Sequence, residues 1–365
     1  MNDDLKITEV NSVKEYDEHV RNLLVTLLGL GSSATRNDQG TRKLGATSIS
    51  FNLLSMYPSI PMTTLRPISW ASILGEMLGF IRGETNVEAF KELGTKVWNA
   101  NAKEPAWKSN ALAPNEGDLG PIYGKQWRKW DDIKVAPYDT DLSTLGYTKM
   151  GRLDDELGWE TVGLPLNAVW RREVDQLMEA LNRIKANPND RRAVISAWNP
   201  GDMDFMALPP CHVMMQLTTV PYAQHKYGSY TDGVNEYEAD IEVVPEFVLN
   251  LVVTQRSQDT LLGRAYNIPA YATLLRLFAH LLEMAPGNLE FNVGDQHLYS
   301  NHGAAADEVT CRESLDKDEE GEKLFQLSIV GVDKFEDLDT LTADNFILTN
   351  QVTHGKLESD TKMTV

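Results

Sequence analysis

The stretch IPAYATLLRLFAHLLEM, residues 268–284, most constrains the fold. Apolar side chains occur on nearly every side of a helix built from it, and such a helix must be covered by other parts of the protein. The chain is long enough to provide that cover. It has 365 residues, 42% of them hydrophobic, and can bury a large core without disulfide bonds.

Other segments predict elements of both kinds. Residues 14–29 and 68–82 carry apolar side chains at helical spacing. A third helix ends at a Pro/Asn turn, and an apolar strand follows it near Ala193. Residues 207–219 and 246–254 are rich in Val, Leu and Met and predict two further strands. Helices and strands follow one another without a regular βαβ alternation, so the pattern favours the α+β class.

Three stretches differ in composition from these elements. Residues 131–165 contain scattered Asp, Gly and Tyr, and residues 219–245 are similarly polar, so both are predicted to be insertions. Residues 305–323 are rich in charge and are expected to be exposed. We expect one domain over 1–365 that carries the two insertions.

Charge and composition exclude several classes of function. The formal net charge of −19 disfavours general binding to nucleic acid, although a few converging arginines can still form a local anion pocket. Two cysteines give neither a disulfide framework nor a zinc motif, and no metal is expected. An acidic N-terminus and short apolar runs predict no signal peptide and no membrane span. The expected location is the cytoplasm, or the host cytoplasm if the protein is viral. No phosphate-binding loop of the GxGxxG or GxxxxGK[ST] type is present.

Cys211, in ALPPCHVMMQL, is the first candidate for chemistry. A thiolate is a strong nucleophile when nearby positive charge stabilises it, whereas a single cysteine in an apolar strand is usually structural. His212 is poorly placed as its base, because adjacent strand residues point to opposite faces. Arg191, Arg192 and Arg256 are better candidates for activating the thiol.

The segment QRSQDTLLGRAYNIPAY places five polar groups beside apolar sequence: Gln255, Arg256, Ser257, Asp259 and Asn267. Buried polar groups need partners. A ligand with a phosphate and a cyclic amide, such as a uracil nucleotide, would supply them, since an amide side chain both donates and accepts. His297 and Tyr299 alternate on a predicted strand and so share one face, where two such groups can hold a sugar hydroxyl. Glu76 lies beside the apolar stripe of residues 68–82, with small residues on the same side.

Taken in order, the segments FIRGETN, VWNAN, GDLGPIYGKQWR, DRRAVISAWN, MALPPCHVMMQ, QRSQDTLLGRAYNI and GDQHLYSNH resemble folate-dependent thymidylate synthases with a cysteine nucleophile. The resemblance runs from about residue 35 to the end of the chain. It implies a large twisted mixed sheet with flanking helices, and a homodimer formed through the sheets. It also implies dUMP as substrate and 5,10-methylenetetrahydrofolate as cosubstrate.

The resemblance implies that Cys211 attacks C6 of dUMP, after which C5 attacks the iminium form of the folate. Glu76 is implied as a general acid/base through ordered water, and Tyr123 as an aid in removing the C5 proton. On the nucleotide side it implies Arg256 and Ser257 at the phosphate, His297 and Tyr299 at the ribose, and Asn267 at the uracil. Gln255 is implied as a further substrate contact, and Arg191 and Arg192 reach the nucleotide from the second subunit. On the folate side it implies Trp98, Asp259, Gly263, Tyr266 and, in a tail that closes over the site, Val365.

The departures from the family pattern gather on the folate side. The usual phosphate loop D-R-T-G-T-G-T is replaced by NDQGTRKLGAT, in which Arg42 is a candidate for the missing arginine. Asn99 follows Trp98 where aspartate is usual. The usual L-G-L-P-F-N-I is LGRAYNI, which introduces Arg264, and Gly79 stands where tryptophan is common.

These departures keep an alternative open. A phage-type deoxyuridylate hydroxymethylase shares the first half of the mechanism, but water instead of hydride then adds to the C5 methylene. Two other classes are also considered: a cysteine hydrolase that uses Cys211 with a histidine, and a nucleotide-binding relative without catalysis. Asn267 in place of aspartate argues against a cytidylate-specific enzyme.

Overall fold

The computed structural model describes residues 8–30, 40–113, 115–152, 167–224 and 243–359. Their main element is a seven-stranded sheet with the order β1-β2-β10-β8-β7-β6, in which β9 also pairs with β10. The strands are β1 (Thr8–Val10), β2 (Thr41–Asn52), β6 (Val194–Ser196), β7 (His212–Pro221), β8 (Phe247–Gln255), β9 (Gln258–Asp259) and β10 (Ala285–Tyr299).

The sheet is mixed. Strand β10 runs antiparallel to β2 and parallel to β8, and β8 runs antiparallel to β7. This register brings His212 on β7 opposite Gln255 on β8, and His297 on β10 opposite Lys43 on β2. The α+β class and the large mixed sheet expected from the sequence are confirmed.

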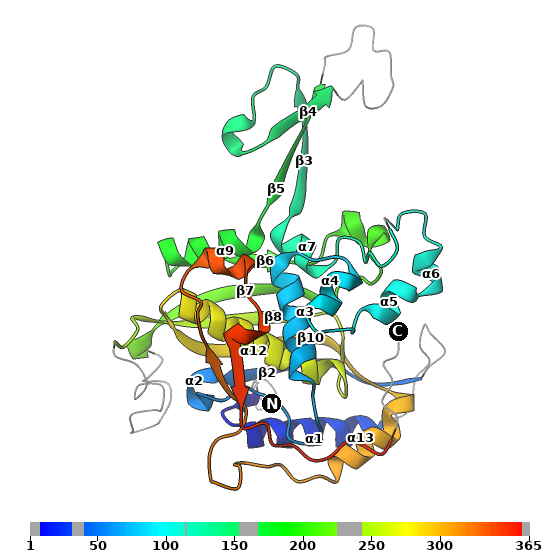
Figure 1. The fold of residues 1–365 in the computed structure, drawn as a ribbon, viewed down its shortest axis with the longest axis vertical. Coiled ribbons are helices and arrows are strands. Elements are labelled where there is room, and N and C mark those ends of the chain that lie inside the picture. Colours follow the sequence, from blue (N-terminus) through cyan, green and yellow to red (C-terminus); the bar gives the residue numbers. More distant parts are fainter. Residues whose placement is uncertain (1–7, 31–39, 114, 153–166, 225–242, 360–365) are drawn as a thin grey trace, which may run out of the picture.

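Helices cover the sheet (Figure 1). The central one is α12 (Gly263–Leu281), most of whose side chains are buried, as its apolar sequence predicts. The other longer helices are α1 (Val13–Gly29), α3 (Trp70–Arg82), α9 (Gln176–Ala186) and α13 (Gly303–Thr310). The short helices are α2 (Leu53–Met56), α4 (Val87–Glu92), α5 (Asn99–Lys103), α6 (Pro105–Lys108) and α7 (Tyr123–Arg128). None of the helices in these ranges is long and apolar enough to cross a membrane.

Local capping explains where the predicted helices begin. The side chain of Ser12 accepts a hydrogen bond from the N–H of Glu15 at the start of α1, and Ser69 does the same for Ser72 at the start of α3. Helix α3 ends at Gly83, whose φ of 74° is a left-handed conformation that glycine adopts without strain. The helices predicted at 14–29 and 68–82 are confirmed within two residues.

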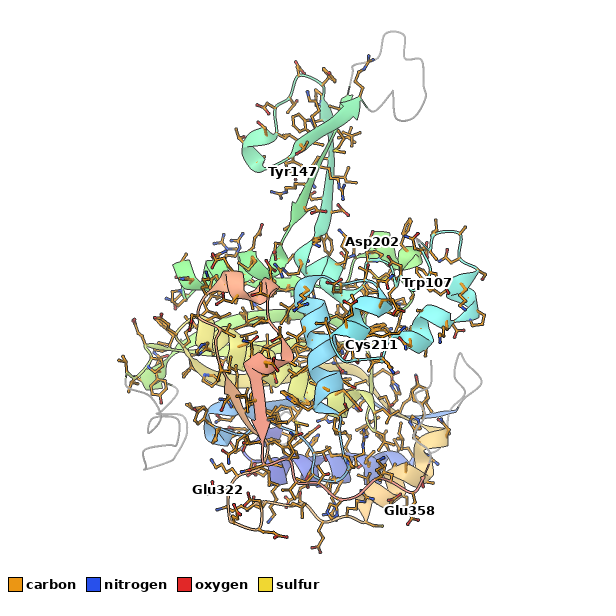
Figure 2. All side chains as sticks on the ribbon, viewed as in Figure 1. Trp107, Tyr147, Asp202, Cys211, Glu322 and Glu358 are labelled. Atoms are coloured by element: carbon orange, nitrogen blue, oxygen red, sulfur yellow. The ribbon has the colours of Figure 1, made fainter. Side chains whose placement is uncertain are left out.

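A three-stranded antiparallel sheet projects from the body (Figure 1) and is called the arm here. It consists of β3 (Trp130–Pro137), β4 (Thr148–Arg152) and β5 (Asn167–Val174), with β5 in the middle. Its own small core contains Tyr147, which Figure 2 labels well away from Cys211 in the body. The predicted insertion at 131–165 falls in the arm but omits the returning strand β5. Most of the other predicted insertion, residues 225–242, lies outside the described residues.

A short two-stranded sheet lies near the end of the described chain. It pairs β11 (Gln326–Ile329) with β12 (Phe346–Thr349). Five short 3₁₀ segments complete the described elements: Ser143–Leu145, Pro200–Phe205, Ser300–His302, Phe335–Asp339 and Ala343–Asn345.

Two boundaries and one exposed stretch predicted from the sequence need correction. The strand predicted at 207–219 begins only at His212, since Pro209 and Pro210 lack the N–H that a ladder needs. The helix predicted at 268–284 begins earlier, at Gly263, and contains Pro269 in its interior. The stretch 305–323 is not uniformly exposed, because the α13 residues Ala305, Ala306 and Val309 are buried.

Candidate functional site around Cys211

Cys211 lies immediately before β7 and is half-buried. Its N–H donates a hydrogen bond to the Tyr123 hydroxyl at 2.7 Å, and its carbonyl accepts one from the N–H of Arg256 at 2.9 Å. The Ser257 hydroxyl is 3.6 Å from the cysteine sulfur. The two preceding prolines end the loop in a fixed conformation, so the thiol is held between α7 and the end of β8.

The Arg256 guanidinium is attached to the backbone just before the cysteine. Its Nε donates to the Pro210 carbonyl and its Nη2 to the Pro209 carbonyl, both at 2.9 Å, while Nη1 is 3.3 Å from the Ser257 hydroxyl. A positive charge is thereby fixed in the loop that precedes the cysteine, where it can bind an anionic ligand. The structure brings together Cys211, Arg256 and Ser257, as predicted.

Glu76, Trp98 and Tyr123 form a buried wall beside this loop. Burial raises the pKa of Glu76 to about 7, with the Trp98 indole acting in the opposite direction. Burial also holds the pKa of the Tyr123 phenol well above its usual value, and the charge of a Cys211 thiolate raises it further. The Tyr123 ring stacks on Phe80 at 4.7 Å. The wall therefore offers a neutral phenol and a carboxyl group that titrates near neutral pH, which suits general acid/base chemistry.

The surroundings of His212 do not suit a base for the thiol. It is buried, its Nδ1 is 3.1 Å from the Tyr271 hydroxyl, and its other polar contact is with Asn267. Burial lowers the pKa of His212 to about 4, so the ring is neutral at pH 7. The expectation that His212 is not the immediate base agrees with this environment. Tyr271 was not identified from the sequence, because one tyrosine in an apolar helix carries no local signal of function.

His297 and Tyr299 lie on β10 with ring centroids 5.1 Å apart, so the predicted shared face is present. The sequence did not identify Asp295, whose Oδ1 is 3.0 Å from Nδ1 of His297 and whose Oδ2 pairs with Lys43. An Asp295 carboxylate that accepts from Nδ1–H leaves Nε2 as the ring nitrogen available to a ligand. This is a suitable arrangement for a sugar hydroxyl.

Asp259 is the last residue of β9, shortly before α12, and lies close to two histidines. Burial raises its pKa, while His302 and His297 act in the opposite direction. Gly263 begins α12, and a Cβ placed on it would lie 3.8 Å from both Asp259 and Asn267. Tyr266, one turn further, is half-buried. The predicted folate-side residues of this segment are therefore close to Asn267, whereas Val365 lies outside the described residues.

Two predicted residues have environments that the sequence did not indicate. Gln255 is fully buried, and its Oε1 accepts from Nε2 of Gln258 at 2.8 Å. Arg42 lies on β2 opposite Leu298, with its Nη1 3.2 Å from where a Cβ of Gly303 would be.

Arg191 and Arg192 are exposed in the turn between α9 and β6. Arg192 pairs with Asp190 through Nη2 and Oδ2 at 2.7 Å. Neither side chain is placed among the residues around Cys211 within this chain. Their predicted reach into a second subunit stays a prediction, because it depends on a partner.

In the ranges that the structure covers, no group of three or more His, Cys, Asp or Glu side chains could hold a metal ion. The groups around Cys211 are a thiol, a fixed guanidinium, a neutral phenol and a carboxyl with a raised pKa. Together they can add a nucleophile to an electron-poor carbon next to an anionic group and move protons near neutral pH.

Comparisons with known proteins agree with this chemistry. A family model described as thymidylate synthase matches residues 14–363. The chain is 32% identical to the thymidylate synthase of Pseudomonas putida over 312 residues, which cover 83% of this chain and 85% of that protein. It is 31% identical to the thymidylate synthase of Bos taurus over 268 residues, which cover 73% of this chain and 60% of that protein.

Plant relatives are larger. The bifunctional dihydrofolate reductase-thymidylate synthase of Daucus carota is 31% identical over 349 residues, which cover 94% of this chain but only 54% of that protein. The chain thus spans about half the length of the bifunctional relatives that it matches.

Proposed function

Since the chain belongs to the thymidylate synthase family, we propose that it transfers a one-carbon group from 5,10-methylenetetrahydrofolate to C5 of dUMP and forms dTMP and dihydrofolate. The observation that carries the proposal is the set of contacts around Cys211. Its backbone N–H is bonded to Tyr123, and its sulfur lies beside the Ser257 hydroxyl, which also contacts the fixed guanidinium of Arg256.

Cys211 is the proposed nucleophile on C6 of the uracil ring. The Arg256 guanidinium anchors the loop that precedes it and binds the nucleotide phosphate. The two roles are compatible, because Nε and Nη2 are used by backbone carbonyls and fix the guanidinium, while Nη1 faces Ser257. Gln255, Arg42, and Arg191 and Arg192 of a second subunit are proposed as further nucleotide contacts, which makes the working unit a homodimer.

Proton transfer is assigned to Glu76 and Tyr123. A carboxyl group with a pKa of about 7 can both donate and accept a proton near neutral pH, which is what protonation at O4 and removal of the C5 proton require. Tyr123 stays neutral and donates its O–H toward the base or an ordered water. Asn267, in contact with the neutral His212, is proposed to recognise the O4 and N3–H of uracil.

The folate is proposed to lie against Trp98, Asp259, Gly263 and Tyr266, with the tail that contains Val365 closing over it. Asp259 is the proposed polar anchor, because burial raises its pKa and leaves it able to share a proton with a ring nitrogen. Cytoplasm is the proposed location. The alternative, a hydroxymethylase in which water adds to the C5 methylene, is not favoured, since the relatives are named thymidylate synthases.

The product of the reaction tests the proposal. The protein is incubated with dUMP and methylenetetrahydrofolate, the nucleotide is identified by mass spectrometry, and dihydrofolate is followed by absorbance. We expect dTMP with an equal amount of dihydrofolate. A 5-hydroxymethyl nucleotide without dihydrofolate would overturn the reductive step, and tight dUMP binding without release of tritium from C5-labelled dUMP would overturn catalysis.

Two cysteine variants identify the nucleophile. Cys211→Ser is expected to abolish turnover while nucleotide binding is kept. The matched control is Cys311→Ser, because Cys311 is exposed and lies after α13. Normal tritium exchange at C5 by Cys211→Ser would contradict the assignment.

A further inference from the structure

Arg264, in the second position of α12, is a charged side chain enclosed by the protein. It is 1% exposed and belongs to LGRAYNI, one of the segments that depart from the family pattern. Its Nη1 donates to Oε1 of Gln258 at 2.9 Å. Burial lowers the pKa of Arg264, and its interaction with the Tyr16 phenol on α1 acts in the opposite direction. The guanidinium is therefore held inside the protein between α1 and β9.

The hydrogen bonds continue from Gln258 to Gln255. Nε2 of Gln258 donates to Oε1 of Gln255 at 2.8 Å, and the two glutamines are only 2% and 1% exposed. A guanidinium donates and never accepts, so the amide atom of Gln258 that faces Arg264 must be the oxygen. The nitrogen of Gln258 then faces Gln255, which must present its own oxygen in return. Arg264 thereby fixes the orientation of both amides, and we call these three residues the amide relay.

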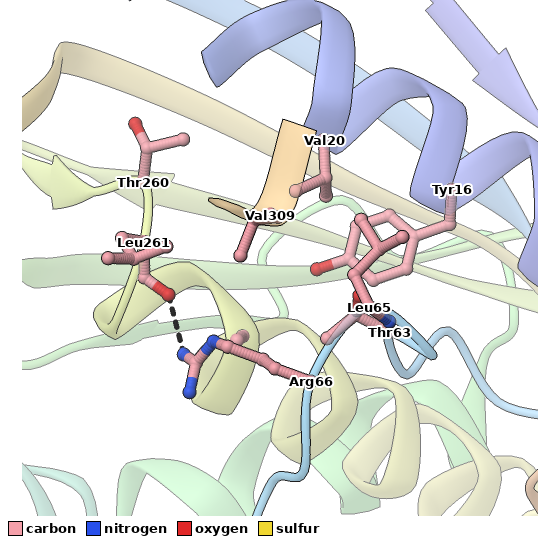
Figure 3. Close-up of a pocket in the computed structure, with 9 residues that line it drawn as sticks. Tyr16, Val20, Thr63, Leu65, Arg66, Thr260, Leu261 and Val309 are labelled. Atoms are coloured by element: carbon pink, nitrogen blue, oxygen red, sulfur yellow. Dashed lines mark hydrogen bonds between the residues drawn. The ribbon is translucent and has the colours of Figure 1, made fainter. Parts of the chain in front are cut away.

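The backbone that carries Gln258 is held in place. Strand β9 pairs with β10, and the Gln258 carbonyl accepts from Nε2 of Gln296 at 3.3 Å. A little further along the chain, Arg66 donates to the Leu261 carbonyl at 2.6 Å, the contact drawn as a dashed line in Figure 3. Since the backbone is fixed on both sides of β9, the orientation of the Gln258 amide is decided by its side-chain partners.

The far end of the amide relay is a hydrogen-bond donor. Nε2 of Gln255 is buried and has no hydrogen-bond partner in the ranges that the structure describes. Gln255 lies directly opposite His212 in the ladder of β7 and β8, and side chains in such a pair lie on one face with Cβ atoms about 5 Å apart. His212 contacts Asn267, the residue proposed to recognise uracil. The idle donor of Gln255 is thus next to the part of the site that is proposed to receive the base.

We propose that Arg264 and Gln258 are positioning residues for base recognition. They hold the Gln255 amide with its nitrogen toward the base, where it donates to O4 of uracil, directly or through one water. Cytosine carries an amino group in place of O4 and needs an acceptor there. The inference rests on the proposed function and deepens it, because it assigns part of the preference for dUMP to a buried arginine that does not touch the nucleotide.

Gln258→Glu reverses the relay without removing a side chain. A carboxylate still accepts from Arg264 but cannot donate to Gln255. The Gln255 amide then turns, donates to the new carboxylate and presents its oxygen to the base. We expect kcat/KM for tritium release from C5-labelled dUMP, relative to that from C5-labelled dCMP, to fall about 10-fold or more, because an acceptor then faces O4.

Thermal unfolding separates positioning from a purely structural role. The carboxylate introduced by Gln258→Glu can pair with Arg264, so the Tm is expected to stay at or above that of the wild type. In the Arg264→Met background the same carboxylate loses this counter-charge, and Gln258→Glu should lower the Tm. A purely structural role of the relay would change the Tm of these variants but not the ratio of the two substrates.

Two changes of Arg264 test its share in the effect. Arg264→Lys still only donates hydrogen bonds and should keep the preference for dUMP, whereas Arg264→Met releases both amides and should lower it several-fold. If Gln258→Glu does not fold, the comparison of these two variants decides. Gln351→Glu is the matched control, because Gln351 is exposed after β12 and the same chemical change there should leave the ratio unaltered.

The outcomes distinguish this inference from the proposed function. A wild-type substrate ratio in Gln258→Glu or in Arg264→Met would overturn the positioning role while the proposed function stands. No tritium release from dUMP by the wild type would instead overturn the proposed function, and the positioning role with it.

Discussion

Gly79 and Phe90 share one space: a Cβ placed on Gly79 would lie 2.2 Å from Cε1 of the Phe90 ring. Gly79 faces inward from α3, and Phe90 on α4 is fully buried with its ring against Phe80 and Trp98, at 6.0 and 6.4 Å between centroids. Gly79 stands where the family commonly has tryptophan. In this chain an aromatic ring from a neighbouring helix fills the space beside the glycine.

Gly79→Ala is therefore expected to destabilise the protein by about 1–3 kcal/mol, because the enclosed Phe90 ring cannot move aside. Urea unfolding measures this loss. Gly29→Ala is the control, since Gly29 ends α1 and a Cβ there meets nothing within 4 Å. In the double variant Gly79→Ala/Phe90→Ala the two costs should not add, because removal of the ring makes room for the methyl group. Simple additivity would mean that the ring is not what excludes the alanine.

Elements with a local sequence signal were predicted correctly, whereas features that depend on tertiary packing were missed. Helices 14–29 and 68–82 carry an apolar stripe and a serine cap, and both were located closely. The early start of α12 was missed because Pro269 resembles the first residue of a helix, although packing tolerates it inside. The small residues on the same side as Glu76 leave no open space, because Gly75 contacts the Leu93 carbonyl and Gly79 contacts the Phe90 ring.

The same distinction holds at the site. Cys211, Arg256 and Ser257 were grouped from separate segments by family resemblance, and the structure brings them together. Tyr271 and Asp295 were missed, because their role depends on contacts with His212 and His297, which the sequence does not show. Polar residues that act through another side chain have no pattern of their own in a single sequence.

The buried carboxyl of Glu76 should make stability depend on pH. Its folded pKa of about 7 is above the ordinary value of 4.5 for a glutamate, so the native state binds the proton more tightly than the unfolded chain does. The free energy of unfolding should therefore fall as pH rises from about 4.5 to 7, by about 3 kcal/mol in all. Glu76→Gln should remove this slope and be the more stable protein at pH 8, at the cost of turnover.

Urea unfolding at several pH values measures the effect, taken as the difference between wild type and Glu76→Gln. The difference is needed because His212, whose folded pKa is about 4, affects the free energy of unfolding in the opposite direction. Its contribution increases stability as pH rises from 4 to 6.5. Glu88→Gln, on the exposed side of α4, is the control and should follow the wild type. Parallel pH profiles for wild type and Glu76→Gln would mean that Glu76 is ionised normally.

Tyr123→Phe removes the acceptor of the Cys211 N–H. Loss of this hydrogen bond should cost about 1 kcal/mol of stability, and turnover should fall by more than the stability loss explains, because the loop that holds the thiol is loosened. Unfolding by urea and the rate of tritium release from C5-labelled dUMP are the two measurements. Tyr138→Phe, at an exposed position of the arm, should change neither. Full activity of Tyr123→Phe would show that the Tyr123 phenol takes no part in the mechanism.

Asn267→Asp should shift preference from dUMP toward dCMP. The amide donates and accepts, and so matches O4 and N3–H of uracil, whereas a carboxylate only accepts and suits the amino group of cytosine. The measurement is kcat/KM for tritium release from C5-labelled dUMP and dCMP. Asn189→Asp, an exposed change of the same kind, should leave the ratio unchanged. If the ratio in Asn267→Asp equals that of the wild type, another residue recognises the base.

The arm should be removable without loss of the fold. Asp132 on β3 and Arg172 on β5 lie directly opposite each other, so residues 133–171 can be replaced by a two-residue Asn-Gly turn that closes the shortened hairpin. The pairs Trp130–Val174 and Asp131–Glu173 at the base of the arm are kept, as are the contacts of Arg128 with Asp175. The deletion removes the whole arm core of Tyr147, Ala168 and Trp170. Because that core is a separate cluster, its loss should expose no residue of the main core. We expect a soluble protein with an almost unchanged Tm and with tritium release within about 3-fold of the wild type, a difference of less than 1 kcal/mol. An insoluble or inactive product would show that the arm is part of the domain and not an insertion into it.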